Sequence, residues 1–142
     1  MELKFKRLNS RAELPRKAHA TDAGLDLTVT SFSMDHKANT IQYGFGLAVE
    51  IPAGHVGLLF PRSSVYKTGL SLTNCVGVID SGYRGEIKAV FASYDRFHCD
   101  AYSIGEHACQ LIVMRIPDVE TTWADELSDS DRGEGGYGST GR

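Results

Sequence analysis

The sequence predicts an all-β fold, a jelly-roll-like β-barrel or sandwich with one short helix. Two observations lead to this prediction. Apolar residues recur at every second position over several stretches, and turn-forming residues separate these stretches at short intervals. The length of 142 residues suits one domain with a core of its own, and the chain contains no internal repeat.

Four stretches are predicted strands. Residues 25–29 and 41–51 alternate apolar side chains with polar or small ones, which is typical of strands buried on one face. Residues 109–116, CQLIVMRI, are apolar on both faces and predict a fully buried strand. Residues 86–94, EIKAVFASY, are a further strand candidate.

Turn residues divide the predicted strands at three places, which are residues 52–54, 81–82 and 103–105. Helix signals are few. Residues 64–68 predict one short helical turn that stops at Gly69, and residues 121–127 predict one more turn. Many short strands with regular turns favour an antiparallel sandwich, jelly roll or small barrel.

Composition excludes several classes of partner. The formal net charge of −3 gives no general attraction to nucleic acid or to an anionic membrane. The N-terminal residues contain no apolar signal region, and no apolar run reaches membrane-spanning length. We therefore expect a cytoplasmic protein that binds neither nucleic acid nor membrane.

The three cysteines, Cys75, Cys99 and Cys109, match no zinc-binding spacing and favour reduced thiols in the cytoplasm. Metal binding by His98 with Cys99, or by His107 with Cys109, is the alternative. Core thiols beside surface histidines explain these pairs more simply, because neither pair has a metal-ligand spacing.

Asp26 lies in the stretch ATDAGLDL, between two leucines that face the core. Alternation then directs its carboxylate away from the core. A solvated strand residue is the ordinary interpretation, and a carboxylate beside a cation at a subunit surface is the functional one.

The stretch PRSS follows an apolar strand and contains Arg62, Ser63 and Ser64. A guanidinium, two hydroxyls and the free N–H groups of a helix start suit an anion such as phosphate. A capped surface turn is the alternative interpretation.

The stretch GVIDSGYRGEI predicts a β-hairpin around residues 81–82. Asp80 ends an apolar run, which holds a carboxylate partly away from water, and Tyr83 follows it. The edge backbone of such a hairpin can read the hydrogen-bonding edge of a flat base. An ordinary hairpin with Asp at its turn is the alternative.

Gln110, in the stretch GEHACQLIV, leads into the apolar strand, where a buried amide needs partners. Either a structural hydrogen bond or a ligand contact provides them. The closing stretch, RGEGGYGSTGR, is too rich in glycine to fold alone. We therefore expect a β domain over residues 1–127 and a flexible lid over residues 128–142.

Taken in order, the five stretches resemble the five motifs of the trimeric dUTP pyrophosphatases, or dUTPases. The stretches read AGLDL, PRSS, GVIDSGYRGEI, GEHACQL and RGEGGYGSTG, and they span most of the chain from Ala20 to Gly141. The third and fifth are the most specific. The resemblance implies a jelly-roll homotrimer with three active sites, each shared by all three chains, that hydrolyses dUTP to dUMP and pyrophosphate with Mg²⁺.

The resemblance also implies roles for particular residues. Asp80 would orient and deprotonate the attacking water, Tyr83 would pack under the deoxyribose, and Asp26 would hold the metal through water. The uracil-reading edge would comprise Asn74, Val78, Ile79 and Asp80, with Lys88 as a further contact. Phosphate contacts would come from Arg62, Ser63, Ser64 and Gln110.

In the family, the fifth motif folds over the bound nucleotide. By resemblance, Tyr137 would stack on the uracil and Arg132 would reach the terminal phosphates, with Gly138 and Ser139 as further contacts. Two positions depart from the family pattern. His107 stands where the fourth motif usually has arginine, and Tyr137 stands where the fifth more often has phenylalanine.

Two other functions remain alternatives at this stage. A dCTP deaminase shares the fold and a PRSS-like motif, but lacks a tail of this form. A non-catalytic protein that binds a nucleotide as a signal is the second, although the residues that hydrolysis requires are present.

Overall fold

The computed structural model describes residues 1–94 and 100–136, which form ten strands and one 3-10 helix. The strands are β1 (Lys4–Arg7), β2 (Leu25–Thr28), β3 (Ser31–Asp35), β4 (Thr40–Gly44), β5 (Leu47–Glu50), β6 (His55–Pro61), β7 (Leu70–Leu72), β8 (Gly77–Ile79), β9 (Lys88–Ser93) and β10 (His107–Arg115). Two four-stranded sheets have the orders β2-β10-β6-β8 and β3-β4-β9-β7, and β1 pairs with β5. All strand pairs are antiparallel, which confirms the predicted all-β, jelly-roll-like fold.

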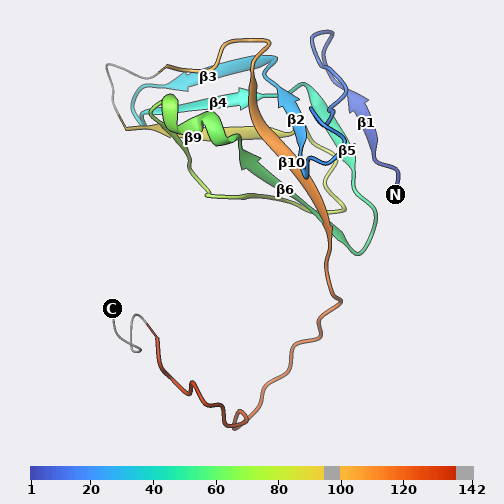
Figure 1. Cartoon of the computed structure of the whole chain (residues 1–142), viewed down its shortest axis with the longest axis vertical. Coiled ribbons are helices and arrows are strands. Elements are labelled where there is room, and N and C mark those ends of the chain that lie inside the picture. Colours follow the sequence, from blue (N-terminus) through green and yellow to red (C-terminus); the bar gives the residue numbers. More distant parts are fainter. Residues whose placement is uncertain (95–99, 137–142) are drawn as a thin grey trace.

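The core lies between the two sheets, whose strands run in different directions in Figure 1. An aromatic cluster fills its centre: the Tyr43 ring meets the rings of Phe91 and Tyr102 edge-on, each at 5.7 Å between centroids. The Tyr102 N–H donates to the Tyr43 hydroxyl at 3.0 Å. This bond ties the segment before β10 to the middle of the opposite sheet.

The predicted strand over residues 41–51 is in fact two strands, β4 and β5, separated by a bend at Phe45 and Gly46. Phe45 is fully buried, and Gly46 has a φ of +64°, a conformation that strains other residues. The bend redirects the chain, so that β4 pairs in one sheet and β5 pairs with β1. Alternation continues through the bend because both strands face the same core.

The strand predicted at residues 109–116 is β10, but only the core-facing side of its first half is fully buried. Cys109 and Leu111 are 0% and 1% exposed, whereas Met114 is 51% exposed. The prediction of full burial is wrong for the other face and for the second half, where Gln110, Ile112 and Val113 are half-buried and Met114 is exposed. We call the face of this sheet that is turned away from the core the outer face; its apolar side chains are Val56, Leu58, Phe60, Val78, Ile112 and Met114.

The predicted helical turn is the 3-10 helix η1 (Ser63–Lys67), and Gly69 follows it with a φ of +67°. The turns at residues 52–54 and 103–105 are also confirmed, since His55 N–H donates to Pro52 and Glu106 N–H to Ser103. Within the described ranges, no helix has the length and apolar character needed to cross a membrane.

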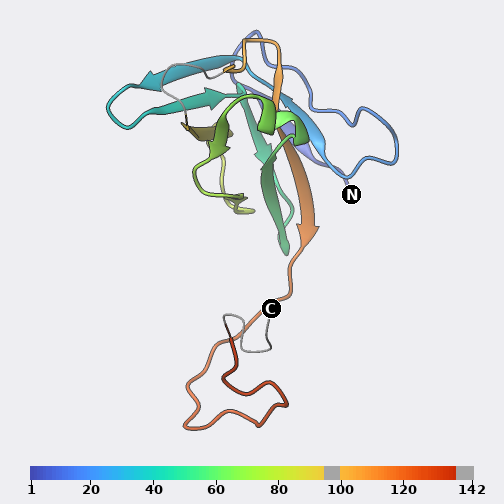
Figure 2. The same ribbon diagram turned by 60° about the vertical axis from the view of Figure 1, so that its left-hand side comes forward.

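Residues 116–136 form an arm that leaves the end of β10 and runs away from both sheets (Figures 1 and 2). Its root is held by the Ile116 N–H, which donates to the Gly54 carbonyl at 2.9 Å. The helical turn predicted at residues 121–127 is wrong, because this segment has only a bend at residues 125–126. A short helix needs tertiary packing to persist, and Trp123 here is fully exposed.

Candidate active site

Asp26 is placed on the outer face by its neighbour Leu27, which is fully buried in the core. Its Oδ1 accepts from Arg62 Nε at 3.1 Å, and its Oδ2 lies 3.8 Å from His107 Nδ1. The Asp26 side chain is 16% exposed. A basic residue of the fourth stretch, His107, thus lies beside this carboxylate.

Arg62 begins the turn that η1 continues. Its N–H donates to the Ala108 carbonyl at 3.2 Å, and its own carbonyl accepts from Val65 N–H at 3.0 Å. Ser63 is exposed and Ser64 is half-buried. A guanidinium and two serines thus follow one another at one end of the sheet, where the partly exposed Arg62 and the exposed Ser63 can bind an anion, while the Ser64 side chain is within reach of the Tyr102 hydroxyl.

Gln110 pairs across the sheet with Asp26 on one side and Phe60 on the other. Its Nε2 donates to the Pro61 carbonyl at 3.3 Å, so part of its amide already has a structural partner. We call Asp26, Arg62, Ser63, Ser64 and Gln110 the Arg62 cluster.

The second group of predicted residues lines a pocket of about 240 Å³ at the opposite end of the same sheet. We call it the Asp80 pocket; its lining includes Asn74, Val78, Ile79, Asp80, Tyr83, Glu86 and Lys88. Asp80 is exposed, so the prediction that its carboxylate is held partly away from water is wrong for this chain alone, and Tyr83 shows 46% of its surface. A carboxylate and a half-open ring therefore share one small cavity.

The chain turns from Asp80 to Tyr83, where the Tyr83 N–H donates to the Asp80 carbonyl at 3.0 Å, but the predicted β-hairpin is wrong. β8 pairs only with β6, while β9 pairs with β4 and β7 in the other sheet. Residues 80–87 therefore connect the two sheets. β8 lies at the edge of its sheet, so backbone groups on its outer side stay available to a ligand.

Glu86 is a residue of this pocket that the sequence did not single out. Its Oε1 accepts from the Gly46 N–H at 2.9 Å, and its Oε2 lies 3.4 Å from Lys88 Nζ. Its backbone carbonyl accepts from the Tyr83 hydroxyl at 3.0 Å. The only sequence signal was an acidic residue two positions before Lys88.

The two groups of residues are separated along β6. Ile79, which precedes Asp80, pairs with Gly57, whereas Arg62 lies five residues further along the chain. At 3.4 Å per residue, five strand residues span about 17 Å. A single chain therefore holds the Arg62 cluster and the Asp80 pocket at opposite ends of one strand.

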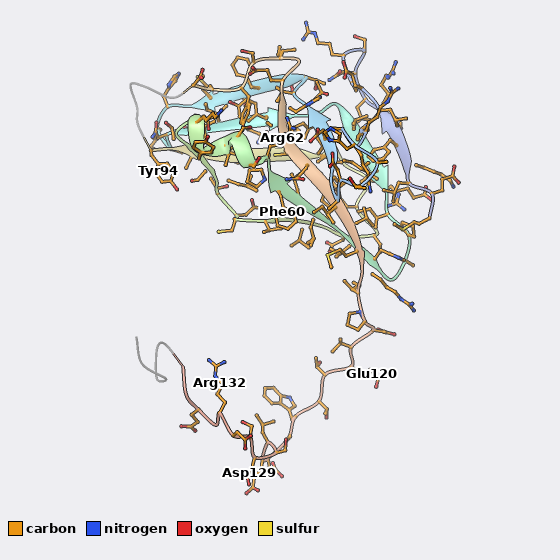
Figure 3. The ribbon with its side chains drawn as sticks, in the orientation of Figure 1. Phe60, Arg62, Tyr94, Glu120, Asp129 and Arg132 are labelled. Carbon is orange, nitrogen blue, oxygen red and sulfur yellow. The ribbon has the colours of Figure 1, made fainter. Side chains whose placement is uncertain are left out.

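Arg132 lies in the arm and joins neither group. Its Nε donates to the nearby Gly135 carbonyl at 2.9 Å, and Figure 3 shows it well apart from Arg62. Tyr137, Gly138 and Ser139 lie outside the described residues.

A further pocket of about 540 Å³ adjoins Asp26 on its other side. Three cationic residues that the sequence did not single out, Arg7, Arg16 and Lys17, help to line it together with His107. The Arg16 carbonyl accepts from the Asp26 N–H at 2.9 Å. Only the density of basic residues near the N-terminus signalled this surface.

Among the described residues, no group of three or more His, Cys, Asp or Glu side chains could hold a metal ion. Cys109 is fully buried, and burial raises the pKa of its thiol to about 12, which disfavours a thiolate ligand. Asp26 supplies a single carboxylate beside Arg62 and His107, and Mg²⁺ commonly keeps several waters and takes one or two carboxylates beside substrate phosphates.

Comparison with known proteins gives a consistent result. A family model described as dUTPase matches residues 10–141. The chain is 38% identical to the deoxyuridine 5′-triphosphate nucleotidohydrolase of Nocardia farcinica, over 96% of this chain and 84% of that protein. It is 41% identical to the protein of the same name from Corynebacterium jeikeium, over 98% of this chain and 92% of that one.

Solved structures are similar over the whole length. The dUTPase of Staphylococcus bacteriophage 80alpha, in complex with dUPNHPP, superposes with a TM-score of 0.86 and 28% identity over 99% of both chains. A mutant dUTPase from phage phi11 of S. aureus, whose structure details the coordination of a structural Mg(II) ion, gives a TM-score of 0.75 and 25% identity over 89% of this chain and 99% of that one.

Proposed function

The chain belongs to the dUTPase family and is a nucleotide hydrolase, and from this premise we propose that it cleaves dUTP to dUMP and pyrophosphate by attack of water on the α-phosphorus. One observation carries the proposal: a single sheet holds an anion-binding cluster at one end and a small pocket with a carboxylate at the other. We place the reaction in the cytoplasm, where thiols such as Cys75 and Cys109 stay reduced.

In the Asp80 pocket, Asp80 acts as the general base that orients and deprotonates the attacking water. The Tyr83 ring packs under the sugar and leaves no room for a 2′-hydroxyl. The edge of β8, through Val78 and Ile79, reads the uracil together with Asn74, and Lys88 adds a further contact. A narrow pocket of this kind rejects thymine by its methyl group and cytosine by its hydrogen-bonding edge.

In the Arg62 cluster, Arg62, Ser63, Ser64 and Gln110 bind the phosphates. The carboxylate of Asp26 orients the Arg62 guanidinium through the 3.1 Å contact. Asp26 also holds Mg²⁺ through water, and the ion, when bound, adds positive charge at the phosphates.

Three copies of the chain complete the site. The Arg62 cluster and the Asp80 pocket of one chain lie apart along β6, and a second copy can bring its own Arg62 cluster closer to that pocket. The apolar outer face gives the copies a surface to share, since side chains such as Val78 and Met114 are 66% and 51% exposed. A homotrimer that brings the Arg62 cluster of one chain to the Asp80 pocket of another accounts for the separation along β6 and for the exposed apolar outer face.

The arm delivers the C-terminal segment to the shared site. The β domain proposed for residues 1–127 has its last strand end at Arg115, and residues 128–142, at the far end of the arm, form the lid, in which Arg132 reaches the phosphates. Tyr137 stacks on the uracil, and Gly138 and Ser139 add contacts. The extended course of the arm supports this role, because it carries Arg132 away from its own sheets (Figure 3).

The test is pyrophosphate release from dUTP, dTTP, dCTP and UTP measured in parallel, with and without Mg²⁺. We expect release from dUTP with Mg²⁺ and at least about a hundredfold less from each other nucleotide. Ammonia release from dCTP would identify a deaminase instead. Tight dUTP binding without any turnover would identify a nucleotide-binding protein without catalysis.

A further inference from the structure

The Tyr83 side chain folds back over the backbone that follows it. Its hydroxyl donates to the Glu86 carbonyl at 3.0 Å, closing a loop of four residues. Gly85 lies under the ring, and a Cβ at this position would overlap the Tyr83 hydroxyl and its ring carbons. The ring is therefore held at its hydroxyl end, and its position depends on where the Glu86 peptide lies.

The Glu86 carboxylate fixes that peptide to the bend between β4 and β5. Its Oε1 accepts from the N–H of the buried Gly46 at 2.9 Å. Gly44 makes room for it, because a Cβ at position 44 would lie 2.8 Å from the same oxygen. A hydrogen bond from a backbone N–H to a carboxylate is stronger than one between neutral groups.

The other carboxylate oxygen holds Lys88. Glu86 Oε2 lies 3.4 Å from Lys88 Nζ, and the Glu86 side chain is only 24% exposed. Ile87, between Glu86 and Lys88, forms two backbone hydrogen bonds. Its N–H donates to the Leu47 carbonyl at 2.8 Å, and its carbonyl accepts from Phe45 N–H at 3.3 Å. Glu86 thus connects the bend between β4 and β5, the carbonyl that holds the Tyr83 hydroxyl, and Lys88.

We propose that Glu86 is a positioning residue that sets the preference for deoxyribonucleotide over ribonucleotide, by fixing the Tyr83 ring and the Lys88 ammonium on either side of it. The inference rests on the proposed function, in which that ring excludes a 2′-hydroxyl. Glu86 acts through Tyr83 and Lys88 and touches no reacting atom. Discrimination of this kind requires a ring that cannot retreat, because a mobile ring would admit the larger sugar.

The experiment compares kcat/KM for dUTP and UTP in the wild type, Glu86→Ala and Glu86→Gln. We expect Glu86→Ala to lower the ratio of the dUTP value to the UTP value by about tenfold, because the Glu86 peptide and the ring above it lose the bond to Gly46 and keep only the backbone bonds that Ile87 makes with Leu47 and Phe45. The amide oxygen of Glu86→Gln still accepts from Gly46. This variant should keep the ratio within about threefold of the wild type but raise KM for dUTP, since Lys88 loses its partner.

Two further variants provide controls. Glu50→Gln breaks an exposed pair, in which Glu50 lies 3.7 Å from Lys4 and the side chains are 53% and 69% exposed, and it should leave both kinetic constants unchanged. Gly85→Ala displaces the Tyr83 ring without altering the Glu86 carboxylate, and it should lower the ratio as Glu86→Ala does. If Glu86→Ala does not fold, Gly85→Ala and Glu86→Gln decide the question.

The outcomes separate this inference from the proposed function. A wild type that does not hydrolyse dUTP refutes the proposed function. A selective wild type whose Glu86→Ala variant slows dUTP and UTP by the same factor shows that Glu86 only stabilises the fold, and overturns the inference. An unchanged ratio in Gly85→Ala, or an unchanged KM in Glu86→Gln, overturns the part assigned to Tyr83 or to Lys88, respectively.

Discussion

Arg62 Nε lies 3.1 Å from Asp26 Oδ1, across the width of β10, which lies between β2, where Asp26 is, and β6, which ends just before Arg62. The carboxylate is 16% exposed and the guanidinium 38%. The Asp26 carboxylate thus orients the Arg62 guanidinium, which stays partly exposed and can bind a ligand. A guanidinium fixed in this way loses less conformational freedom when it binds a phosphate.

Asp26→Asn should reduce kcat/KM for dUTP by about 10- to 100-fold and raise the Mg²⁺ concentration needed for half-maximal rate. The variant keeps the shape of the side chain but removes the charge that orients Arg62 and attracts the metal. Pyrophosphate release at a series of Mg²⁺ concentrations measures both effects. Asp22→Asn is the matched control, because the half-buried Asp22 pairs with His19 and lies outside both groups of site residues. Equal Mg²⁺ dependence in both variants would contradict the role of Asp26.

Asp80→Asn should lower kcat by about 10² to 10⁴, the usual contribution of a general base, while dUTP still binds tightly. Single-turnover pyrophosphate release measures the first quantity and equilibrium titration the second. Asp35→Asn, in the turn between β3 and β4, controls for the substitution itself. If Asp80→Asn turns over dUTP at the wild-type rate, another group is the base.

A chain that ends at Asp131 should assemble like the full chain but lose activity. Removal of Arg132 and of the aromatic ring beyond it costs the phosphate contact and base stacking. Stacking alone contributes about 1–3 kcal/mol, which corresponds to roughly a 5- to 150-fold loss in kcat/KM. Light scattering checks the assembly and pyrophosphate release the kinetics. An unaltered kcat/KM would show that the lid has no part in turnover.

The free energy of unfolding should fall at alkaline pH because of Cys109. Burial raises the pKa of its thiol from 9.0 to about 12. The folded state therefore keeps its proton where the unfolded state loses it, so the stabilisation is complete below pH 9 and is lost as the pH rises toward about 12. Three pKa units correspond to at most about 4 kcal/mol.

Urea unfolding of the wild type and Cys109→Ala between pH 8 and pH 11 measures this contribution. The variant is less stable at pH 8 because it leaves a small cavity, but its stability should fall less steeply with pH. Burial also raises the pKa of Tyr102 and the Cys109 charge raises it further, so part of the difference between the two curves comes from Tyr102. Parallel curves for the two proteins would exclude the Cys109 contribution.

The strands were predictable because side chains alternate in any strand. Leu25, Leu27 and Val29 thus located β2, whereas β10 was located by a run that is apolar on both faces. The break at Gly46 was not predictable, since alternation is identical on both sides of it and only its φ of +64° distinguishes it. The hairpin prediction failed for a related reason: a turn fixes the local path, whereas strand pairing depends on distant segments.

For the candidate site, the sequence indicated the residues but not their arrangement in space. The order and residue types of five stretches were enough to select Asp26, Arg62, Asp80 and Tyr83. Their separation along β6 was not, because it follows from the register that pairs Gly57 with Ile79. Glu86 was missed because the hydrogen bond that fixes its carboxylate comes from the Gly46 N–H, forty positions away in the chain.

Trp123 is the only tryptophan of the chain, and it stands fully exposed in the arm. Its indole emission therefore reports on one segment alone, with no background from the core. Burial of the ring against another copy shifts that emission to shorter wavelength, and dilution that separates the copies reverses the shift. The protein thus contains an intrinsic fluorophore for following the engagement of its own arm, without any added label.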